Sequence, residues 1–532
     1  MIRFTTAFGV VCLASTLLGG TFRRALERVP SMDPIQCATV YAARAVALCY
    51  ETPLEYVYGE RPYRLKPGLL SKMPEISPDG LHYTLTLRTN AVFHASPALG
   101  GKSRPVTAED LRYSIARVKD PANASAGAWL AADIVRMEVK GTHQLTISLR
   151  TPNPQFGWYL AMPYFAVVPK EAIGSWEFRE CSVGSGPYRL AEWKRNHHMR
   201  FERAEGWPLW QETNPKPFDS ILYLVIDDPT TQWMMFLNGE LDFLTNLTQD
   251  SWDIVFDAQG NLSPELAGRN IHYRAEPALN LMYLGINMRD PLLGRNRALR
   301  QALCAAFDWN QWRDYFQGRV AGPIQSPVPP VLAGAVTNRA PFAFDLALAR
   351  RLLKEAGYPG GIDPKSGLPL RIALDVGKPT QEARETSELI ASFYRACGIE
   401  VVPRYNTWPA FLKRLREGQT QLFRIGWVAD YPDAQNFMQL FISRNLPPGP
   451  NRTAFVDPET DALYAKAEQC LRPEDQHRFW RPIQERVRTE CPMIFTHCSQ
   501  NSALVPDALK AYRPSDFPYG EEKYFPDFHR RD

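Results

Sequence analysis

The chain lacks the short motifs that mark most catalytic and nucleotide-binding sites. It has no G-x-x-x-x-G-K-[ST] phosphate loop, no H-E-x-x-H zinc motif and no C-x-x-C pair. Gly184-Ser185-Gly186 lacks the spacing of a G-x-S-x-G nucleophile elbow, and Arg189 stands where a dinucleotide-binding fingerprint needs its third glycine. The motifs give no support to an enzyme, although the members of a catalytic triad can be scattered along a chain.

An excess of charge of one sign is also missing. The 532 residues hold 61 Lys and Arg against 57 Asp and Glu, a formal net charge of +4. This is far short of a nucleic-acid-binding footprint, so we expect no nucleic-acid partner. After residue 20 no stretch approaches the ~18 uncharged apolar residues of a membrane span. The 45% hydrophobic content excludes a disordered or fibrous chain, and the length predicts roughly three to four domain-sized units.

The first 20 residues are the exception to this even pattern. Arg3 is their only charge, and an apolar and small-residue stretch runs from Ala7 to Gly20. A basic start, a short apolar core and a small-residue exit are typical of a secretory signal, and the core is short for a membrane anchor. The alternative is a buried helix or strand. We predict a signal peptide over residues 1–20 and a periplasmic or cell-surface protein.

Nine cysteines are present, and eight remain once Cys12 of the signal is removed. Export allows an even number of cysteines to pair, but eight cysteines permit too many connectivities for the sequence to choose one. His497 and Cys498, near Cys491, could bind a soft metal ion. A structural role for these cysteines is the favoured interpretation. We therefore expect no metal and no cofactor.

Strand and helix patterns alternate along the chain. Leu81 to Arg88 alternates apolar and polar residues, as a half-buried strand does, and Thr107 with Asp110 resembles a capping box at the start of a helix over Val106 to Val118. This alternation predicts an α/β protein with mainly parallel sheets. The other predicted strands are 145–149, 221–226, 239–243, 280–286, 368–375, 399–405 and 423–428, and the other predicted helices are 231–238, 295–307, 345–357, 380–396, 408–417, 457–470 and 474–489.

Several segments, in one order over more than 400 residues, resemble a known family. The most specific segment is Gly184-Ser185-Gly186-Pro187-Tyr188, and the last is Trp427 to Asn436 (WVADYPDAQN). The chain resembles the extracellular solute-binding proteins of peptide and nickel ABC importers, the dipeptide/oligopeptide-binding family. The other segments that carry the resemblance are Met32-Asp33-Pro34, Leu85 to His94, Thr107 to Leu111, Gly239 to Asp242, Tyr283 to Asn287, Arg300 to Leu303, Ala306 to Asp308 and Leu352 to Gly357.

The resemblance implies a two-lobed, type II periplasmic-binding-protein architecture that closes on a ligand. The first lobe would span residues 21–282 and include an extra subdomain, 50–181. The second lobe would span 283–501, and residues 502–532 would return to the first lobe. Hinges are expected at 279–285 and 497–504, because two crossings between lobes permit a hinge motion. The family also implies a permease of an ABC importer as partner, and we expect a monomer.

The resemblance places the ligand at the end of the strand over 423–428. In similar peptide-binding proteins an aspartate just after a tryptophan pairs with the peptide's α-ammonium, and here these residues are Trp427 and Asp430. Asp433 is the fallback for Asp430, and Tyr431 lies in the same turn. The alternative is that Asp430 only begins this turn. A free amine does need a compensating carboxylate once water is expelled.

Five other assignments have weaker support. Arg424 matches an arginine that binds the ligand's carboxylate in some relatives. It could equally form a structural ion pair with Asp430, because both side chains would lie on the same side of a continuous strand. Trp427 could be a ligand wall or core. Tyr283 and Asn287 are cleft candidates, although Asn287 could instead cap a turn, and Glu51 matches a position near the cleft.

The predicted function is that of an exported receptor that captures short peptides and presents them to a membrane permease without covalent chemistry. A receptor for a nickel chelate, haem, an opine or an oligosaccharide is the alternative within the family. A secreted α/β hydrolase is the alternative from another class, and it would need a nucleophile–base pair that the sequence does not reveal.

Overall fold

The computed structural model describes residues 20–174, 182–245, 247, 249–257, 259–316 and 323–525. The predicted signal peptide therefore lies outside the described residues, except for Gly20. None of the helices in these ranges combines the length and the hydropathy that a bilayer crossing requires.

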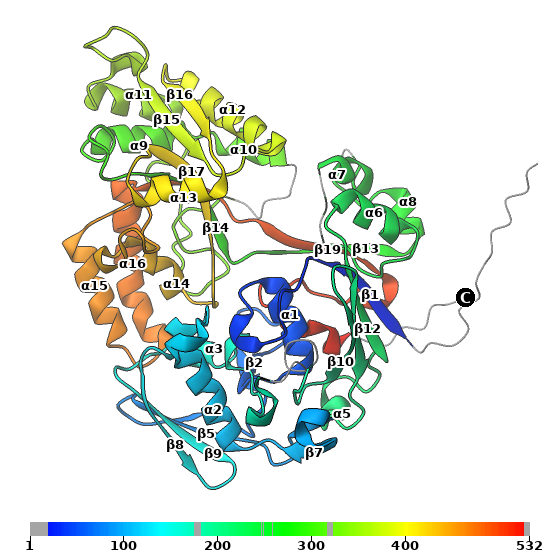
Figure 1. Cartoon of the computed structure of the whole chain (residues 1–532). Coiled ribbons are helices and arrows are strands. Elements are labelled where there is room, and N and C mark those ends of the chain that lie inside the picture. Colours follow the sequence, from blue (N-terminus) through cyan, green and yellow to red (C-terminus); the bar gives the residue numbers. More distant parts are fainter. Residues whose placement is uncertain are drawn as a thin grey trace, which may run out of the picture.

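The first lobe is built on a four-stranded sheet in the order β1-β12-β11-β10 (Figure 1). Helix α1 (Val40–Cys49) packs beside this sheet. The Gly184–Gly186 turn lies directly against the end of α1, where the Gly186 amide donates to the Cys49 carbonyl at 2.8 Å. A Cβ atom at Gly184 would lie 1.9 Å from the Cys49 carbonyl oxygen, so this close approach requires glycine. The strands are β1 (Thr21–Leu26), β10 (Tyr188–Lys194), β11 (His198–Arg203) and β12 (Ser220–Val225).

The subdomain of the first lobe is an antiparallel sheet, β4-β5-β9-β8, covered by α2 (Ala108–Lys119). The capping box expected from the sequence is present: the Asp110 amide donates to Thr107 Oγ1, and the Thr107 amide donates to the Asp110 carboxylate. Leu111 and Ile115 of this helix are fully buried against the sheet. The strands are β4 (Glu75–Ile76), β5 (His82–Thr86), β8 (Ile134–Lys140) and β9 (Gln144–Leu149).

The second lobe is built on a five-stranded sheet in the order β16-β15-β17-β14-β18. Helices α9 (Arg297–Ala306), α11 (Leu346–Glu355) and α12 (Gln381–Arg395) contribute to the apolar core on this sheet. The strands are β14 (Asn280–Ile286), β15 (Arg371–Val376), β16 (Glu400–Tyr405), β17 (Leu422–Val428) and β18 (Met493–His497).

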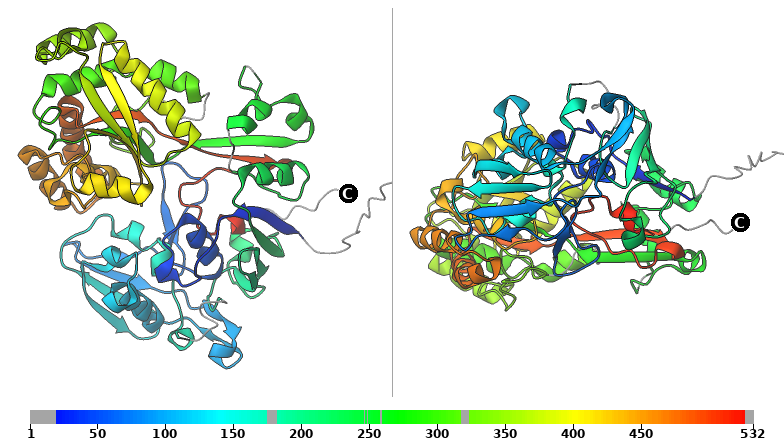
Figure 2. Two further views of the ribbon diagram at one scale, coloured as in Figure 1. Left: turned by 45° about the horizontal axis from the view of Figure 1, so that its top comes forward. Right: turned by 90° about the horizontal axis from the view of Figure 1, so that it is seen from below.

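The two lobes are joined by a pair of long strands. Strands β13 (Ile271–Pro277) and β19 (Gln500–Pro506) run antiparallel to each other between the lobes (Figure 2). The chain enters the second lobe from β13 into β14 and leaves it from β18 into β19. These crossings lie beside the segments expected to act as hinges, and the exact lobe boundaries stay a prediction.

The expectation of mainly parallel sheets is wrong. Among the described strands, the parallel pairs are β1 with β12, β15 with β16, and β15 with β17, and the other pairs are antiparallel. The reason is that β10 and β11 form a hairpin and β14 arrives from the other lobe, so strand direction does not follow from the local alternation with helices. The strand predicted over 239–243 is reduced to one isolated bridge, Arg24 to Phe243.

A buried ion cluster fixes the C-terminal segment to the first lobe. Arg24 of β1 is 1% exposed, and its Nη1 lies 2.8 Å from Glu522 Oε1 and 3.3 Å from Glu521 Oε1. The Tyr223 hydroxyl of β12 also donates to Glu522 at 2.8 Å. Residues 521 and 522 thus pack against β1, the first strand of the fold.

The remaining described elements are shorter or lie at the edges of the lobes. They are β2 (Leu54–Tyr56), β3 (Leu65–Pro67), β6 (Val92–Ser96), β7 (Lys102–Pro105), α3 (Phe156–Tyr159), α5 (Trp210–Thr213), α6 (Pro229–Leu237), α7 (Gln249–Val255), α8 (Pro264–Gly268), α10 (Trp309–Phe316), α13 (Trp408–Arg416), α14 (Gln435–Met438), α15 (Pro458–Glu468) and α16 (Pro473–Glu490).

Candidate functional site

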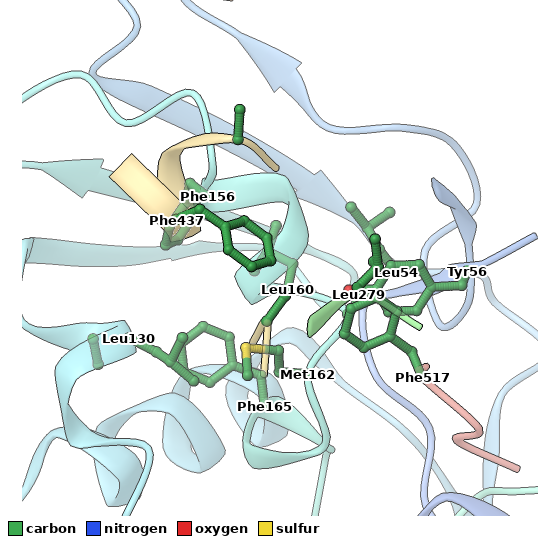
Figure 3. Packing of buried hydrophobic residues seen from close by; sticks show 14 of the residues in the cluster. Leu54, Tyr56, Leu130, Phe156, Leu160, Met162, Phe165, Leu279, Phe437 and Phe517 are labelled. Carbon is green, nitrogen blue, oxygen red and sulfur yellow. The ribbon is translucent and has the colours of Figure 1, made fainter. Parts of the chain in front are cut away.

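The lobes meet along a continuous cluster of buried apolar side chains. Phe156 of α3 in the subdomain and Phe437 of α14 in the second lobe lie together (Figure 3). Leu54, Leu279 and Phe517 form a second part of the same cluster, beside the crossing into β14 (Figure 3). The structure therefore has its lobes in contact, and residues from both border the space between them.

Asp430 lies where β17 has ended, on the side of the second lobe that faces the first. It is partly buried, and Asn436 Nδ2 donates to its Oδ2 at 3.4 Å. Within the described residues the Asp430 carboxylate forms no ion pair. Burial raises the pKa of Asp430, and the hydrogen bond from Asn436 opposes that rise. A nearby cation would stabilise the charged form of such a partly buried, unpaired carboxylate.

Asn436 also fixes the position of Trp427. Its Oδ1 accepts from Trp427 Nε1 at 2.8 Å and from the Asp430 amide at 3.3 Å. Asn436 itself is fully buried. One amide side chain thus links the tryptophan and the aspartate of the predicted motif. Asn436 lies at the end of the segment that carries the resemblance, but nothing in the sequence alone indicates that it forms this link.

Three tyrosines of the first lobe lie near enough to Asp430 for its charge to affect them. Tyr56, Tyr164 and Tyr519 all have their pKa raised, mainly by burial and additionally by the negative charge of Asp430. For Tyr164 the pKa rises to about 12. The charge of Asp430, in the second lobe, therefore affects the pKa of tyrosines in the first lobe. These tyrosines come from widely separated parts of the chain, so no local pattern could have identified them.

An aromatic pocket in the first lobe adjoins these tyrosines. Tyr56 stacks on Phe517 with ring centroids 4.7 Å apart and on Trp158 at 5.7 Å. The pocket encloses about 50 Å³ and is also lined by Glu51, Glu55, Trp207 and Tyr519. The abundance of aromatic residues in the sequence is thus partly explained by rings that line this space.

Arg424 is a second desolvated charge in the second lobe. Its Nη1 donates to Thr386 Oγ1 of α12 at 3.0 Å, and its guanidinium lies 5.9 Å from the centre of the Trp312 ring. Burial lowers the pKa of Arg424, and Glu382 opposes this. In the described part of the chain no ion pair joins Arg424 to a carboxylate, Asp430 included. Because β17 ends at Val428, the alternation of a continuous strand does not extend from Arg424 to Asp430.

Tyr431 and Asp433 lie in the contact between the lobes. The Tyr431 ring packs edge-on against Tyr159 of the subdomain at 5.4 Å, and Gln155 hydrogen-bonds to the Asp433 carboxylate. Gln155 Nε2 also donates to Gln476 Oε1 of α16 at 2.7 Å. The two predicted ligand residues thus contact the opposite lobe.

The other three predicted residues lie away from Asp430 or are already paired. Tyr283 is 2% exposed within β14, an interior strand between β17 and β18. Asn287 donates to the carbonyls of Gly418 and Thr420, which lie before the start of β17, at the opposite end from Asp430. These hydrogen bonds correspond to the alternative interpretation, in which Asn287 caps a turn.

Glu51 lines the aromatic pocket, but its carboxylate already has partners. Its Oε1 accepts from Arg88 Nη2 at 2.5 Å and from Trp207 Nε1 at 3.2 Å. Glu51 therefore supports the wall of the pocket, and it is not a free charge like Asp430.

Comparison with known proteins identifies the family. The model of the bacterial extracellular solute-binding proteins, family 5, matches residues 64–445, well over half of the chain. The chain belongs to this family. Its two-lobed α/β fold is the fold of solved family members, as expected from the sequence, and the family is one of transport receptors.

Relatives within the family have different ligands in their names. Heme-binding protein A of Haemophilus influenzae is 24% identical over 473 residues, which cover 86% of this chain and 83% of the relative. Glutathione-binding protein GsiB of Salmonella typhimurium is 27% identical over 441 residues, 80% of this chain and 79% of the relative. The structure of DppA from Helicobacter pylori in complex with the peptide STSA matches with a TM-score of 0.72 and 21% identity, covering 95% of this chain and 96% of that one. This last similarity shows the fold alone.

No group of three or more His, Cys, Asp or Glu side chains within the described residues is arranged to hold a metal ion.

Proposed function

We propose that this protein is an exported receptor that captures short peptides between its lobes and delivers them to the membrane permease of an ABC importer. Its role is binding and release, without covalent chemistry. The observation that carries the proposal is Asp430: a partly buried carboxylate that faces the other lobe, accepts from the Asn436 amide and forms an ion pair with none of the described residues.

The α-ammonium of a peptide is the complement of this carboxylate. A buried charge without a counterion is unfavourable, and an incoming ammonium replaces the water that closure expels. Trp427 stands next to Asp430 through Asn436 and offers a flat apolar surface to the first side chain of the ligand. Tyr56, Tyr164 and Tyr519 supply the opposite wall.

Arg424 is proposed as the residue that receives the peptide's carboxylate. Its guanidinium is desolvated and has a hydroxyl, Thr386, as its hydrogen-bonding partner. A guanidinium can bind a carboxylate through two parallel hydrogen bonds. A zwitterionic ligand would thus neutralise one unpaired charge at each end.

Haem is the second candidate ligand, because the chain is similar to Heme-binding protein A over most of its length. Haem offers a flat ring to the aromatic pocket, but its free carboxylates would be repelled by Asp430. The peptide hypothesis uses Asp430, and the haem hypothesis does not. The name of GsiB, which binds a tripeptide, also favours the peptide.

Native mass spectrometry of the purified exported protein tests the proposal first. We expect co-purifying masses of mixed short peptides. Calorimetric titration of the stripped protein with a tripeptide, its N-acetylated form and haem then separates the candidates. We expect binding of the free tripeptide and at least about 30-fold weaker binding of the N-acetylated form, because the buried charge pair is lost.

Asp430→Asn should produce the same loss, whereas Glu355→Gln, at an exposed position on α11, should bind as the wild type does. Unchanged affinity in Asp430→Asn would remove the role of Asp430 and leave the peptide ligand standing. Binding of haem without any peptide binding would overturn the peptide proposal itself.

A further inference from the structure

Two of the seven free cysteines in the described residues lie against each other in the second lobe. Cys304 is on α9, and Cys491 follows α16 directly, in a left-handed conformation with φ of 50°. The Cys304 thiol is the largest cause of a raised pKa at Cys491, so the two thiols are neighbours. Each thiol otherwise contacts a backbone carbonyl: Cys304 Sγ lies 3.8 Å from the Met493 oxygen and Cys491 Sγ lies 3.3 Å from the Arg488 oxygen.

The backbone around the two thiols is held in place on both sides. Gln301 Nε2 donates to the Thr489 carbonyl and Arg300 Nε donates to the Glu490 carbonyl, both at 2.9 Å. Cys304 lies one turn further along α9 and reaches Met493. The segment from Thr489 to Met493 thus runs along α9 with Cys491 in its middle. Two thiols that lie on packed segments and line one cavity are well placed to bond.

An apolar cavity gives access to the pair. It encloses about 80 Å³, and both cysteines line it together with Phe307, Trp309 and Phe495. Cys304 is partly exposed, whereas Cys491 is 2% exposed. An oxidant that enters the cavity therefore meets Cys304 first.

We propose that Cys304 and Cys491 are joined by a disulfide bond in the exported protein. Disulfides persist outside the cytoplasm, where members of this family work. The oxidant is of the dithiol/disulfide class. The Cys304 thiolate attacks a sulfur of the oxidant's disulfide, forms a mixed disulfide and releases one thiolate.

Cys491 completes the reaction. Its thiolate attacks Cys304 Sγ and releases the second thiol of the oxidant; the two protons lost by the cysteines go to the two released thiolates, and the oxidant gains the two electrons. The neighbouring Cys304 thiol, together with burial, raises the pKa of Cys491, so Cys491 acts second.

The bond would tie α9 to the segment that leads into β18, inside the second lobe. It closes a long loop of the chain, and such a cross-link stabilises mainly by restricting the unfolded state. It does not touch the contact between the lobes, so we expect ligand affinity to stay unchanged.

Alkylation and mass spectrometry test the proposal on the full mature chain. The folded protein is incubated with glutathione disulfide, then denatured and treated with N-ethylmaleimide. We expect two fewer alkylated thiols than in a dithiothreitol-reduced sample, and a digest in which the Cys304 peptide is linked to the Cys491 peptide. The oxidised protein should also melt at a higher temperature than the reduced protein.

Three single variants make the result specific. Cys304→Ser and Cys491→Ser should each abolish the cross-link and the difference in melting temperature. Cys397→Ser, a buried cysteine of the same lobe, should retain both. Full alkylation of Cys304 and Cys491 after oxidation, or a cross-link of either one to another cysteine, would overturn the proposal.

Discussion

At the scale of single residues, the site depends on how Asp430 is surrounded. The carboxylate has lost part of its water, receives one hydrogen bond from Asn436 and faces phenol rings of the other lobe. Exposed aspartates of this chain have ordinary partners in turns and helix caps; Asp228, for example, caps α6. Aspartate therefore has a structural role at Asp228 and could bind a ligand at Asp430, because the two side chains differ in burial and in hydrogen-bonding partners.

The raised pKa of Asp430 predicts how peptide affinity depends on pH. Burial raises its pKa in the free protein, and a bound ammonium would lower it again by favouring the charged form. Binding therefore releases a proton when the pH is near the raised pKa, and affinity should fall as the pH is lowered through it. Titrations at several pH values, in buffers of different ionisation enthalpy, measure both effects.

Asp430→Asn is the control for this pH dependence. It should show a weak affinity that does not change over the same acidic range. A wild-type affinity that is equally constant down to pH ~3.9, the ordinary pKa of aspartate, would contradict the role given to Asp430.

At the scale of secondary-structure elements, local chemistry decided much of the fold. Thr107 caps α2, as the sequence predicts; Asp345 caps α11, and Gly357 follows α11 with φ of 89°. These features are recognisable because a cap or a left-handed residue satisfies groups within one helix turn. Strand direction is different, because it depends on partners that arrive from elsewhere in the chain, and here the prediction of mainly parallel sheets failed.

Asp457 offers a test at this scale. It caps α15 through the Thr460 amide, and its carboxylate pairs with Arg486 of α16 at 2.6 Å and 2.7 Å. Arg486 holds the pKa of Asp457 below its usual value. A depressed pKa contributes stability that is present above the ordinary pKa of aspartate and is lost as the pH falls through the lowered value.

Asp457→Asn keeps a good cap and removes the ion pair, so it should lower the free energy of unfolding by about 0.5–1 kcal/mol at pH 7. Asp457→Ala also removes the cap and should cost about 1 kcal/mol more. Urea denaturation at pH 7 and at acidic pH measures these differences, and the gap between Asp457→Asn and the wild type should narrow in acid. A gap of the same size at both pH values would count against the ion pair.

At the scale of the whole molecule, the lobes are held together by contacts that the ligand would complete. Gln155 connects the subdomain to Asp433 and Gln476, Tyr159 packs on Tyr431, and Phe156 lies with Phe437 (Figure 3). Much of this contact is apolar, so it persists without a ligand. A bound peptide would add its ammonium and carboxylate groups to lobes that are already in contact.

Gln155→Ala should weaken the closed form. A neutral hydrogen bond contributes about 0.5–1.5 kcal/mol, so we expect peptide affinity to fall about 2- to 10-fold. The radius of gyration of the ligand-free protein, measured by small-angle X-ray scattering, should increase. Gln469→Ala, at an exposed position in the second lobe, should change neither quantity. An unchanged radius and affinity in Gln155→Ala would show that Gln155 does not help to hold the lobes together.

The sequence by itself determined the local elements, their caps and the tryptophan–aspartate motif, because each depends on residues close together in the chain. Only the tertiary structure decided that Asn436 links Trp427 to Asp430, that the charge of Asp430 reaches Tyr56, Tyr164 and Tyr519, and that Asn287 serves a turn. It also brought Cys304 to Cys491. These relations join residues from different lobes or distant segments, and only the packing of the folded chain fixes such distances.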